Sequence, residues 1–309
     1  MATAAKRKKK AAPPIRRKCG TMQVHHWLLE DDPDFRARQV ALEHDTSMRA
    51  RTALAKKAEP YRVKVVVHVV YASDRENISD AQVKSQITAL NRDYRAKNTD
   101  KSKVPTPFAG LVADAFVEFE LASVDPKGKP TNGITRTATT RTEFEDDDAV
   151  KDSAKGGADA WPTDKYLNLW VCTLGGGLLG YAQFPGGPVK TDGVVILNTA
   201  FGTSGSAKAP FNKGRTATHE VGHYLNLRHI WGDTEDCSGG DLVADTPNAE
   251  TANFGKPKFP HVTCSNGPNG DMFMNYMDYV DDAAMFMFSS GQVQRMHVAL
   301  DGPRKKLYK

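Results

Sequence analysis

The stretch 218–233, THEVGHYLNLRHIWGD, constrains the fold of this chain more than any other part of the sequence. His219 and His223 stand at positions i and i+4, so on a helix they project from the same face about one turn apart. Two imidazoles at that spacing can bind one zinc ion, and Glu220 stands next to the first of them. His229 follows beyond a break in the helical pattern. The sequence therefore predicts a zinc-site helix and, after it, a third imidazole for the same ion.

These residue types indicate catalysis rather than a structural metal site. Three neutral imidazoles leave the fourth position of a tetrahedral zinc ion open, whereas a structural zinc ion has four protein ligands. A carboxylate at Glu220 can polarise a water molecule at that position and accept its proton. A chance H-E-x-x-H in an unrelated helix is the alternative, but a third histidine in an otherwise apolar segment argues against chance.

The order of the remaining elements predicts an α+β domain. Residues 61–71, YRVKVVVHVVY, are rich in valine and are typical of a buried strand. After Ser79, a residue that can cap a helix, apolar side chains recur at helical spacing. The zinc-site helix is followed by a loop-rich part, 232–270, and by a final serine-capped helix over 290–300. Further strands are expected at 116–124, 133–137, 165–174, 177–185 and 193–202.

The first sixty residues differ in charge from the rest of the chain. They hold 14 lysines and arginines against 7 acidic residues, a surplus of +7 in a chain of net charge +5. We expect residues 1–60 to form a basic leader and residues 61–309 to form the catalytic domain. Within the leader, residues 1–20 are expected to be disordered and residues 33–59 to have weak helical character.

The basic run KRKKK within the leader allows a second interpretation, a polyanion-binding protein whose metal site is merely structural. No aromatic residues interleave with these charges, which favours a solvated tail, and we expect no specific nucleic-acid partner. No apolar stretch approaches the roughly 18–20 residues that cross a bilayer. The sequence predicts no particular oligomeric state.

Four cysteines, Cys19, Cys172, Cys237 and Cys264, allow three complete pairings, and the sequence alone does not choose among them. Cys19 is unusual because it lies in the leader, within RRKCGT, where it cannot help to build a core. Cys172 lies on an apolar strand and is most simply a buried free thiol.

The pattern H-E-x-x-H-x-x-G-x-x-H is the zinc motif of the metzincins. GRTATHEVGHYLNLRHIWGD resembles the pappalysin family, in particular its short microbial members of the ulilysin and cytophagalysin type. Asn226 replaces the motif glycine, and asparagine is the next most tolerant residue of a left-handed turn. The resemblance implies a zinc endopeptidase that hydrolyses protein or peptide substrates. It also implies a metzincin-type fold: a twisted, mostly parallel sheet with an antiparallel rim strand at LLGYAQFPGG, a long active-site helix and a loop-rich C-terminal subdomain ending in a helix.

The resemblance also assigns roles to residues below the metal. MNYMDYVDD, residues 274–282, matches the methionine-containing turn of the metzincins, so Met277 would form a hydrophobic floor beneath the histidines. A methionine of an ordinary core is the alternative. Tyr279 matches a family tyrosine whose hydroxyl ligates zinc or steadies the oxyanion during attack.

Calcium and a disulfide follow from the resemblance alone. Asp241, Asp245 and Thr246 lie in GGDLVADTPN, which resembles a calcium-binding loop, with an ordinary Asp-rich turn as the alternative. Cys237 and Cys264 occupy the positions of one family disulfide, with two reduced cysteines as the alternative. Calcium and a disulfide favour a secreted protein, although the first twenty residues contain no readable secretory signal.

RKCGT, residues 17–21, matches the Arg-x-Cys-Gly-Thr form of a latency switch in ulilysin-like members. The resemblance implies a latent zymogen in which Cys19 binds the zinc ion and Gly20 lets the backbone enter the cleft without a side chain. Arg17 would then meet a carboxylate in the cleft. Release would follow cleavage at the basic residues around 49–51 or 56–57. A functionless tail cysteine is the alternative.

One departure from the family concerns specificity. An acidic residue that favours basic side chains on the leaving side of the scissile bond is replaced here by Ala283. A preference for Arg or Lys is therefore not carried over, although Asp281 and Asp282 lie nearby and can compensate. The natural substrate is not predicted.

Overall fold

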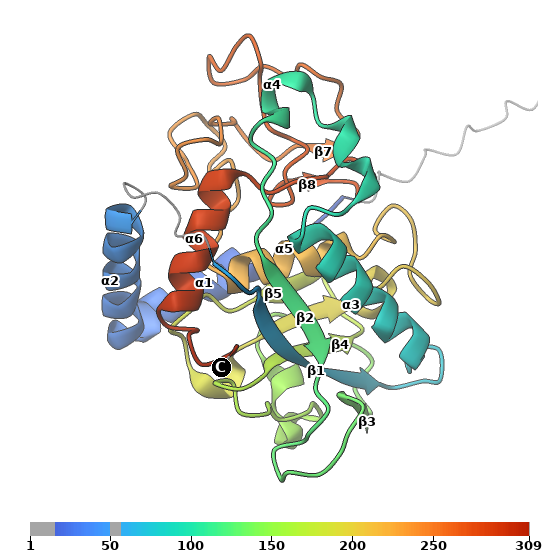
Figure 1. Ribbon diagram of the computed structural model, residues 1–309. Coiled ribbons are helices and arrows are strands. Elements are labelled where there is room, and N and C mark those ends of the chain that lie inside the picture. The colour runs from blue at the N-terminus through green and yellow to red at the C-terminus, as the bar shows by residue number, and fades with distance from the viewer. Residues whose placement is uncertain (1–15, 50–56, 309) are drawn as a thin grey trace, which may run out of the picture.

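The structure is a computed structural model that describes residues 16–49 and 57–308. The basic run at residues 6–10 and most of the expected cleavage sites lie outside the described residues. Within the described ranges, no helix is both long and apolar enough to cross a bilayer. The fold class is the expected one, because helices and loops surround one mostly parallel sheet (Figure 1).

The main sheet has strand order β2-β1-β4-β6-β5, and β3 also pairs with β1. Valines of β1 are buried on both of its faces, as is typical of a strand inside a parallel sheet. All neighbours pair in parallel except β5, which runs antiparallel to β6 at the edge. The strands are β1 (Tyr61–Tyr71), β2 (Val117–Leu121), β3 (Ile134–Ala138), β4 (Leu167–Cys172), β5 (Gly180–Ala182) and β6 (Val194–Leu197).

Helices α3 (Asp80–Tyr94) and α5 (Arg215–Tyr224) pack against each other and against the sheet (Figure 1). Ser79 caps α3 as expected, because its side chain accepts a hydrogen bond from the Gln82 amide at 3.2 Å. Val83 and Leu90 of α3 enter the same core as Val221 of α5. Short helices fill the connections: Thr99–Lys103, α4 (Thr106–Ala109), Ala149–Lys151, Ser153–Lys155, Val189–Thr191 and Asn198–Ala200.

After α5 the chain has little regular structure until its last helix, as expected. β7 (Phe254–Gly255) and β8 (Tyr279–Val280) form a small parallel sheet of their own. The expected disulfide joins Cys237 to Cys264 in this part, and Cys172 is a buried free thiol. α6 (Ser290–Asp301) begins with a capping box that Ser289 makes with Gln292.

The described part of the leader is more ordered than expected. Residues 1–20 are expected to be disordered, and this is wrong for residues 16–20, since Arg17 is only 3% exposed. The sequence does not predict α1 (Thr21–Asp31), which packs against β5. α2 (Pro33–Arg49) follows and lies beside α6 (Figure 1). Burial against the catalytic part therefore orders a segment whose own composition does not.

Candidate active site

Helix α5 carries the H-E-x-x-H motif through the interior, and every one of its residues is buried. Gly214 precedes it with φ of 76°, and Asn226 follows it with φ of 75°. The Leu227 amide donates to the Gly222 carbonyl at 2.9 Å, which closes the turn after the helix. Asn226 thus adopts the left-handed conformation expected for the residue that replaces the motif glycine. The turn directs the following segment back toward the helix.

Three imidazole nitrogens converge at one point as a result of this turn. The Nε2 atoms of His219 and His229 are 3.2 Å apart, and His223 Nε2 is 3.1 Å from each of them. Zn–N bonds of about 2.0–2.1 Å in tetrahedral geometry separate the ligand nitrogens by roughly 3.3–3.4 Å. The observed separations are therefore close to those that a zinc ion requires.

The opposite nitrogen of each ring is already engaged, which fixes the tautomer suited to a metal ligand. Burial holds the pKa values of His219 and His223 well below the ordinary histidine value, so both rings are neutral and have a free lone pair. The Nδ1 contacts are His219 with the Tyr276 carbonyl at 2.8 Å, His223 with the Leu227 carbonyl at 2.8 Å, and His229 with Asp233 Oδ1 at 2.6 Å.

Met277 lies directly beneath the zinc-site helix. It is fully buried, and a Cβ atom added at Gly222 would come within 2.5 Å of its sulfur. Gly222 is therefore the residue that lets the helix approach the methionine closely. The Met277 amide is fixed by Asn275 Oδ1 at 2.9 Å. This position is the one predicted for the methionine floor.

Glu220 is buried beside the three histidines, and its carboxylate faces the leader. Oε2 accepts hydrogen bonds from Thr21 Oγ1 at 2.9 Å and from Cys19 Sγ at 3.2 Å. Burial raises the pKa of Glu220 to about 7, and the two hydrogen bonds act in the opposite direction. A carboxyl group with a pKa near neutrality can both accept and return a proton. Thr21 is a contact that the sequence analysis missed, although it is the last residue of RKCGT.

Cys19 lies at the centre of the site. Its Sγ and one nitrogen from each of the three histidines all lie within 4.8 Å of one another. Burial and the Glu220 carboxylate raise the pKa of the Cys19 thiol well above its usual value. The backbone reaches this point along the rim strand, since the Leu179 amide donates to the Lys18 carbonyl at 2.9 Å and the Gly20 amide to the Gly180 carbonyl at 3.0 Å. The chain thus pairs in parallel with β5.

Arg17 enters a buried pocket beside the histidines. Its Nη2 donates to Asp282 Oδ1 at 2.7 Å and its Nη1 to Thr216 Oγ1 at 3.1 Å. The guanidinium lies over the ring of Phe211, with its carbon 4.9 Å from the ring centre. Both side chains of the Arg17–Asp282 pair are almost wholly inaccessible to solvent. The carboxylate expected to meet Arg17 is therefore Asp282, next to Ala283.

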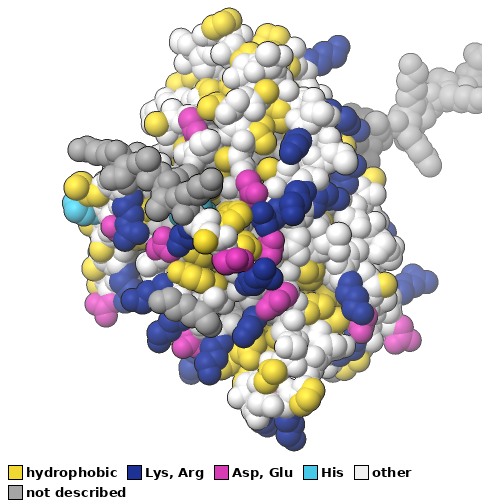
Figure 2. All heavy atoms as spheres, in the orientation of Figure 1, with side chains coloured by type: hydrophobic (Ala, Val, Ile, Leu, Met, Phe, Trp, Pro, Cys, Tyr) yellow, Lys and Arg dark blue, Asp and Glu magenta, His cyan; other side chains and the backbone are white. Residues whose placement is uncertain are grey.

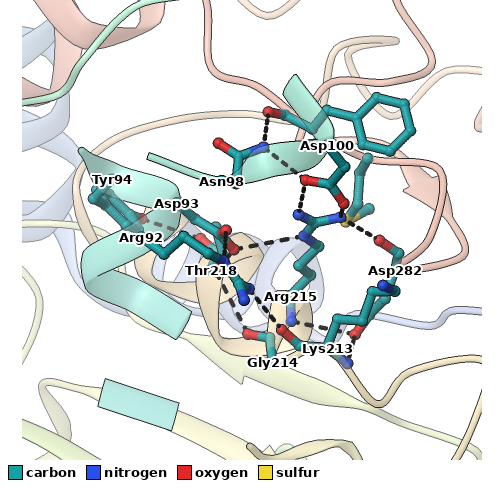
Figure 3. A network of polar contacts seen from close by, with 12 residues as sticks. Arg92, Asp93, Tyr94, Asn98, Asp100, Lys213, Gly214, Arg215, Thr218 and Asp282 are labelled. Atoms are coloured by element: carbon teal, nitrogen blue, oxygen red, sulfur yellow. Dashed lines mark hydrogen bonds and ion pairs between the residues drawn. The ribbon is translucent and has the colours of Figure 1, made fainter. Parts of the chain in front are cut away.

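A buried polar network holds Asp282 in place (Figure 3). Its Oδ2 accepts from the Lys213 amide at 2.7 Å and from the Arg215 amide at 3.3 Å, at the start of α5. The Arg215 side chain donates to the Asp282 carbonyl at 2.6 Å and makes a bidentate pair with Asp100, at 2.7 and 2.8 Å. The sequence alone does not predict a role for Asp100, because nothing local in the sequence links it to Arg215, which is distant in the chain.

Tyr279 lies against two of the three histidines. Its ring centre is 4.9 Å from that of His229 and 5.7 Å from that of His219, and Trp231 packs against it at 4.7 Å. Burial raises the pKa of Tyr279 well above its usual value. The hydroxyl therefore stays protonated and can donate a hydrogen bond.

The three expected calcium ligands are only partly brought together. Asp241 and Thr246 are in contact, with Thr246 Oγ1 donating to both carboxylate oxygens at 2.7 and 2.9 Å. Asp245 instead accepts from Ser289 Oγ at 2.6 Å and from the Gly291 amide at 2.8 Å, at the start of α6. Calcium binding stays a prediction.

A mostly parallel sheet with an antiparallel rim strand, a buried helix with converging histidines and a methionine beneath it define a metzincin-type zinc metallopeptidase. A family model described as pregnancy-associated plasma protein-A, of the peptidase M43 family, matches residues 150–301. An extracellular metalloprotease of Pyricularia oryzae is 31% identical over 290 residues, which cover 90% of this chain and 87% of that protein. The chain belongs to this pappalysin family, as the sequence motifs indicated, and it is a metalloprotease.

Two solved structures agree with this assignment. Mature mirolysin of Tannerella forsythia, in complex with a cleaved peptide, is 52% identical with a TM-score of 0.80, covering 82% of this chain and 97% of its own. A mutant of promirolysin of Tannerella forsythia is 47% identical with a TM-score of 0.87, covering 94% of this chain and 97% of its own. The expected fold and enzyme class are therefore confirmed.

Proposed function

We propose that this chain is the latent form of a secreted zinc endopeptidase. His219, His223 and His229 hold the zinc ion, Glu220 is the general base, and Cys19 is the fourth zinc ligand in the latent form. The observation that carries the proposal is the meeting of the leader thiol with three inward-facing imidazole nitrogens. The extracellular metalloproteases among its relatives support secretion.

The chain's own residues account for the movement of protons during peptide hydrolysis. When bound, zinc supplies a Lewis acid that polarises the peptide carbonyl and favours deprotonation of water. Glu220 accepts the proton of the attacking water and then delivers it to the departing amine, for which a pKa near 7 is well matched. Tyr279, protonated and beside the histidines, donates a hydrogen bond to the oxyanion.

Latency is supported by how the leader lies in the cleft. Cys19 takes the position that water would need, Arg17 fills the Asp282 pocket, and Thr21 binds the general base. Promirolysin matches 94% of this chain, whereas the mature form matches 82%, so the proform accounts for additional residues. We place the division between leader and catalytic domain near residue 60, between the end of α2 and the start of β1.

The Arg17 pocket also supports a substrate class. Asp282, Thr216 and the Val280 carbonyl offer three acceptors to one guanidinium, and Phe211 offers an aromatic face. Once Arg17 leaves, Asp282 is a buried carboxylate without its cation, and a basic substrate side chain restores the pair. We therefore propose a preference for basic side chains next to the scissile bond, with Asp282 compensating for Ala283.

The polyanion-binding alternative gains no support from the described residues. The polyanion-binding interpretation depends on the run at 6–10, which lies outside the described residues. On the face that Figure 2 shows, the basic side chains of the described residues lie among acidic ones.

Calcium at Asp241 and Thr246 remains a proposal that direct measurement of calcium content can test.

The decisive experiment is the variant Glu220→Ala, tested after limited proteolysis has removed the leader. We expect zinc content of one ion per chain and a loss of peptide hydrolysis of at least about 10³-fold, since general acid–base catalysis contributes about 10²–10⁴-fold. Glu120→Ala, at an exposed carboxylate of β2, is the control and should keep its activity. Undiminished hydrolysis by Glu220→Ala would overturn the mechanism.

A further inference from the structure

A second leader side chain, Glu43 of α2, lies between two arginines of the catalytic part. Its carboxylate binds the guanidinium of Arg295 through both oxygens, with one of the two contacts at 2.8 Å. Arg228 Nη2 lies 3.8 Å from the same carboxylate. The planar, two-point pairing with Arg295 is the geometry with which arginine recognises carboxylates.

The two arginines form a site that the catalytic part already holds in place. The Arg295 side chain is only 2% exposed, and its Nε donates to the Asn226 carbonyl at 2.7 Å. Arg228 Nε is buried and has no hydrogen-bond partner among the described residues. Burial and the charge of Arg295 lower the pKa of Arg228, whereas Glu43, Asp233 and Asp241 raise it. Two like charges are therefore kept close together, and Glu43 is the carboxylate that pairs directly with both of them.

Loss of the leader leaves this site without its anion. Within residues 16–49 and 57–308, Glu43 is the one carboxylate that forms an ion pair with either Arg228 or Arg295. Removing one partner of a largely buried pair is costly, because the remaining charge has neither its partner nor full hydration. The opened site consequently has a strong tendency to take up another carboxylate.

The site adjoins the loop that carries the third histidine. Arg228 immediately precedes His229 in the loop between the second and third histidines, and Arg295 of α6 donates to the Asn226 carbonyl of the same loop. The leader runs from Arg17 in the Asp282 pocket, through Cys19 at the histidines, and on into α1 and α2. Along the leader, Arg17 therefore precedes the segment that crosses the histidines, and Glu43 follows it.

Other contacts of α2 show that it covers a surface continuous with the rim strand. Arg38 Nε donates to the Gly186 carbonyl and Gln39 Nε2 to the Pro185 carbonyl, each at 2.6 Å. These carbonyls follow β5, along which the leader backbone pairs in the cleft. A peptide that pairs with β5 and continues past it would therefore approach the surface that α2 covers in the latent form.

We propose that, once the leader has left, Arg228 and Arg295 form a carboxylate-binding subsite for an acidic side chain of the substrate. This subsite lies on the side of the scissile bond opposite the Asp282 pocket, so the enzyme selects peptides with a basic residue on one side and an acidic residue on the other. The inference rests on the proposed peptidase function. Mature mirolysin, which matches 82% of this chain, is an example of a similar catalytic fold in its mature form.

The test uses the leader-free enzyme and pairs of fluorogenic peptides. Each peptide has an arginine placed for the Asp282 pocket, and each pair differs by Glu or Gln at one of the second to sixth residues on the opposite side of the bond. We expect one position at which Glu gives about a tenfold higher kcat/KM than Gln, mainly through KM, equivalent to about 1.4 kcal/mol. Moving the Glu to the same side as the arginine should give no such preference.

The variant Arg228→Gln should reduce the Glu-to-Gln ratio toward one. Arg228→Lys keeps the positive charge but lacks the planar guanidinium that binds a carboxylate at two points, so it should give an intermediate ratio. This conservative variant also tests whether the effect of Arg228→Gln comes from misfolding. Arg136→Gln is the matched control, because Arg136 is similarly exposed and pairs with Asp80 away from this loop. Its ratio should equal that of the wild type.

The outcomes separate the two proposals. A wild-type enzyme that cleaves neither peptide of any pair contradicts the proposed peptidase function. Equal cleavage of Glu and Gln peptides at every position contradicts the subsite alone, and so does a preference that survives in both Arg228 variants.

Discussion

The part of the molecule that forms the main sheet, residues 61–197, and the loop-rich part, residues 225–289, share one apolar core but differ in how their backbones are held. The sheet part is held by continuous apolar packing, and all six valines of β1 are buried. The loop-rich part adds side chains such as Met277 and Phe288 to the same core, but its regular structure is limited to the two-residue strands β7 and β8, and a disulfide and buried polar contacts join its loops. Buried Asp278, for example, accepts from the amide and side chain of Asn253. Hydrophobic burial is non-directional, whereas hydrogen bonds require particular partners.

The active site divides along the same line. Helix α5, packed against the sheet, supplies Glu220 and two of the histidines. The loop-rich part supplies His229, Tyr279 and the Asp282 pocket. The difference teaches that the sheet part positions the helix that carries Glu220, while the loop-rich part completes the histidine cluster and shapes the pocket. The contacts that join the two parts are therefore where substitutions should be most informative.

The largest effect is expected from the leader, which touches both parts at once. Cys19→Ala removes the thiol from the histidines, so the full chain should hydrolyse peptides before any processing, at a rate at least about 100-fold above the wild type. We expect this increase in rate because the substitution opens a metal position that a strong ligand otherwise fills. Cys172→Ala, at the buried thiol of β4, is the control and should remain latent. A Cys19→Ala chain as inactive as its parent would contradict the switch.

An intermediate effect is expected at the two ends of α5, where two buried arginines form similar pairs. Arg215, paired with Asp100, holds Asp282, whereas Arg304, paired with Asp192 at 2.8 and 2.9 Å, holds the Tyr224 carbonyl. In the leader-free enzyme, Asp100→Asn should raise KM for a peptide with a basic residue by about tenfold, or about 1.4 kcal/mol.

The control for this prediction is the pair at the other end of the helix. Asp192→Asn weakens an equally buried contact, so it should lower the melting temperature while leaving the KM ratio of basic to neutral peptides unchanged. If both variants alter that ratio equally, Arg215 supports the helix rather than the pocket.

The smallest effect is expected on the free energy of unfolding when two buried asparagines are replaced by glycine. The sign of the change should differ between the loop-rich part and the sheet part. Asn226 has positive φ, and neither polar atom of its side chain has a partner among the described residues. Asn226→Gly should therefore stabilise the protein by about 1 kcal/mol, the relief of an unsatisfied group less the entropy cost of glycine. Asn168→Gly on β4 should destabilise it, because that side chain bonds His68 and Trp161. Thermal unfolding measures both, and a lower melting temperature for Asn226→Gly would contradict the first.

The sequence predicted what periodicity and local motifs encode. The bounds of β1 and the Ser79 cap of α3 follow from neighbouring residues, and so does the histidine spacing. Composition predicted residues 16–20 to be disordered, because a short basic segment becomes ordered only through distant contacts such as Arg17 with Asp282; the resemblance of RKCGT to a latency switch did place this segment in the cleft. The pairing of Asp100 with Arg215 was missed for the same reason. Contacts between residues far apart in the chain have no periodic signal.

The Thr21 hydroxyl has a consequence for how activity is switched on. It accepts a hydrogen bond from the Ala182 amide at 2.8 Å and donates one to Glu220 at 2.9 Å. One side chain therefore engages both a backbone donor of the rim strand and the proposed general base. With Cys19 and Arg17 only a few residues away, one short segment blocks the rim strand, the base, the metal position and the pocket. Because these contacts belong to one short segment, we expect them to be released in one cooperative event rather than in sequence. Activation should consequently be all-or-none for each molecule, so a partly processed population is a mixture of silent and fully active chains.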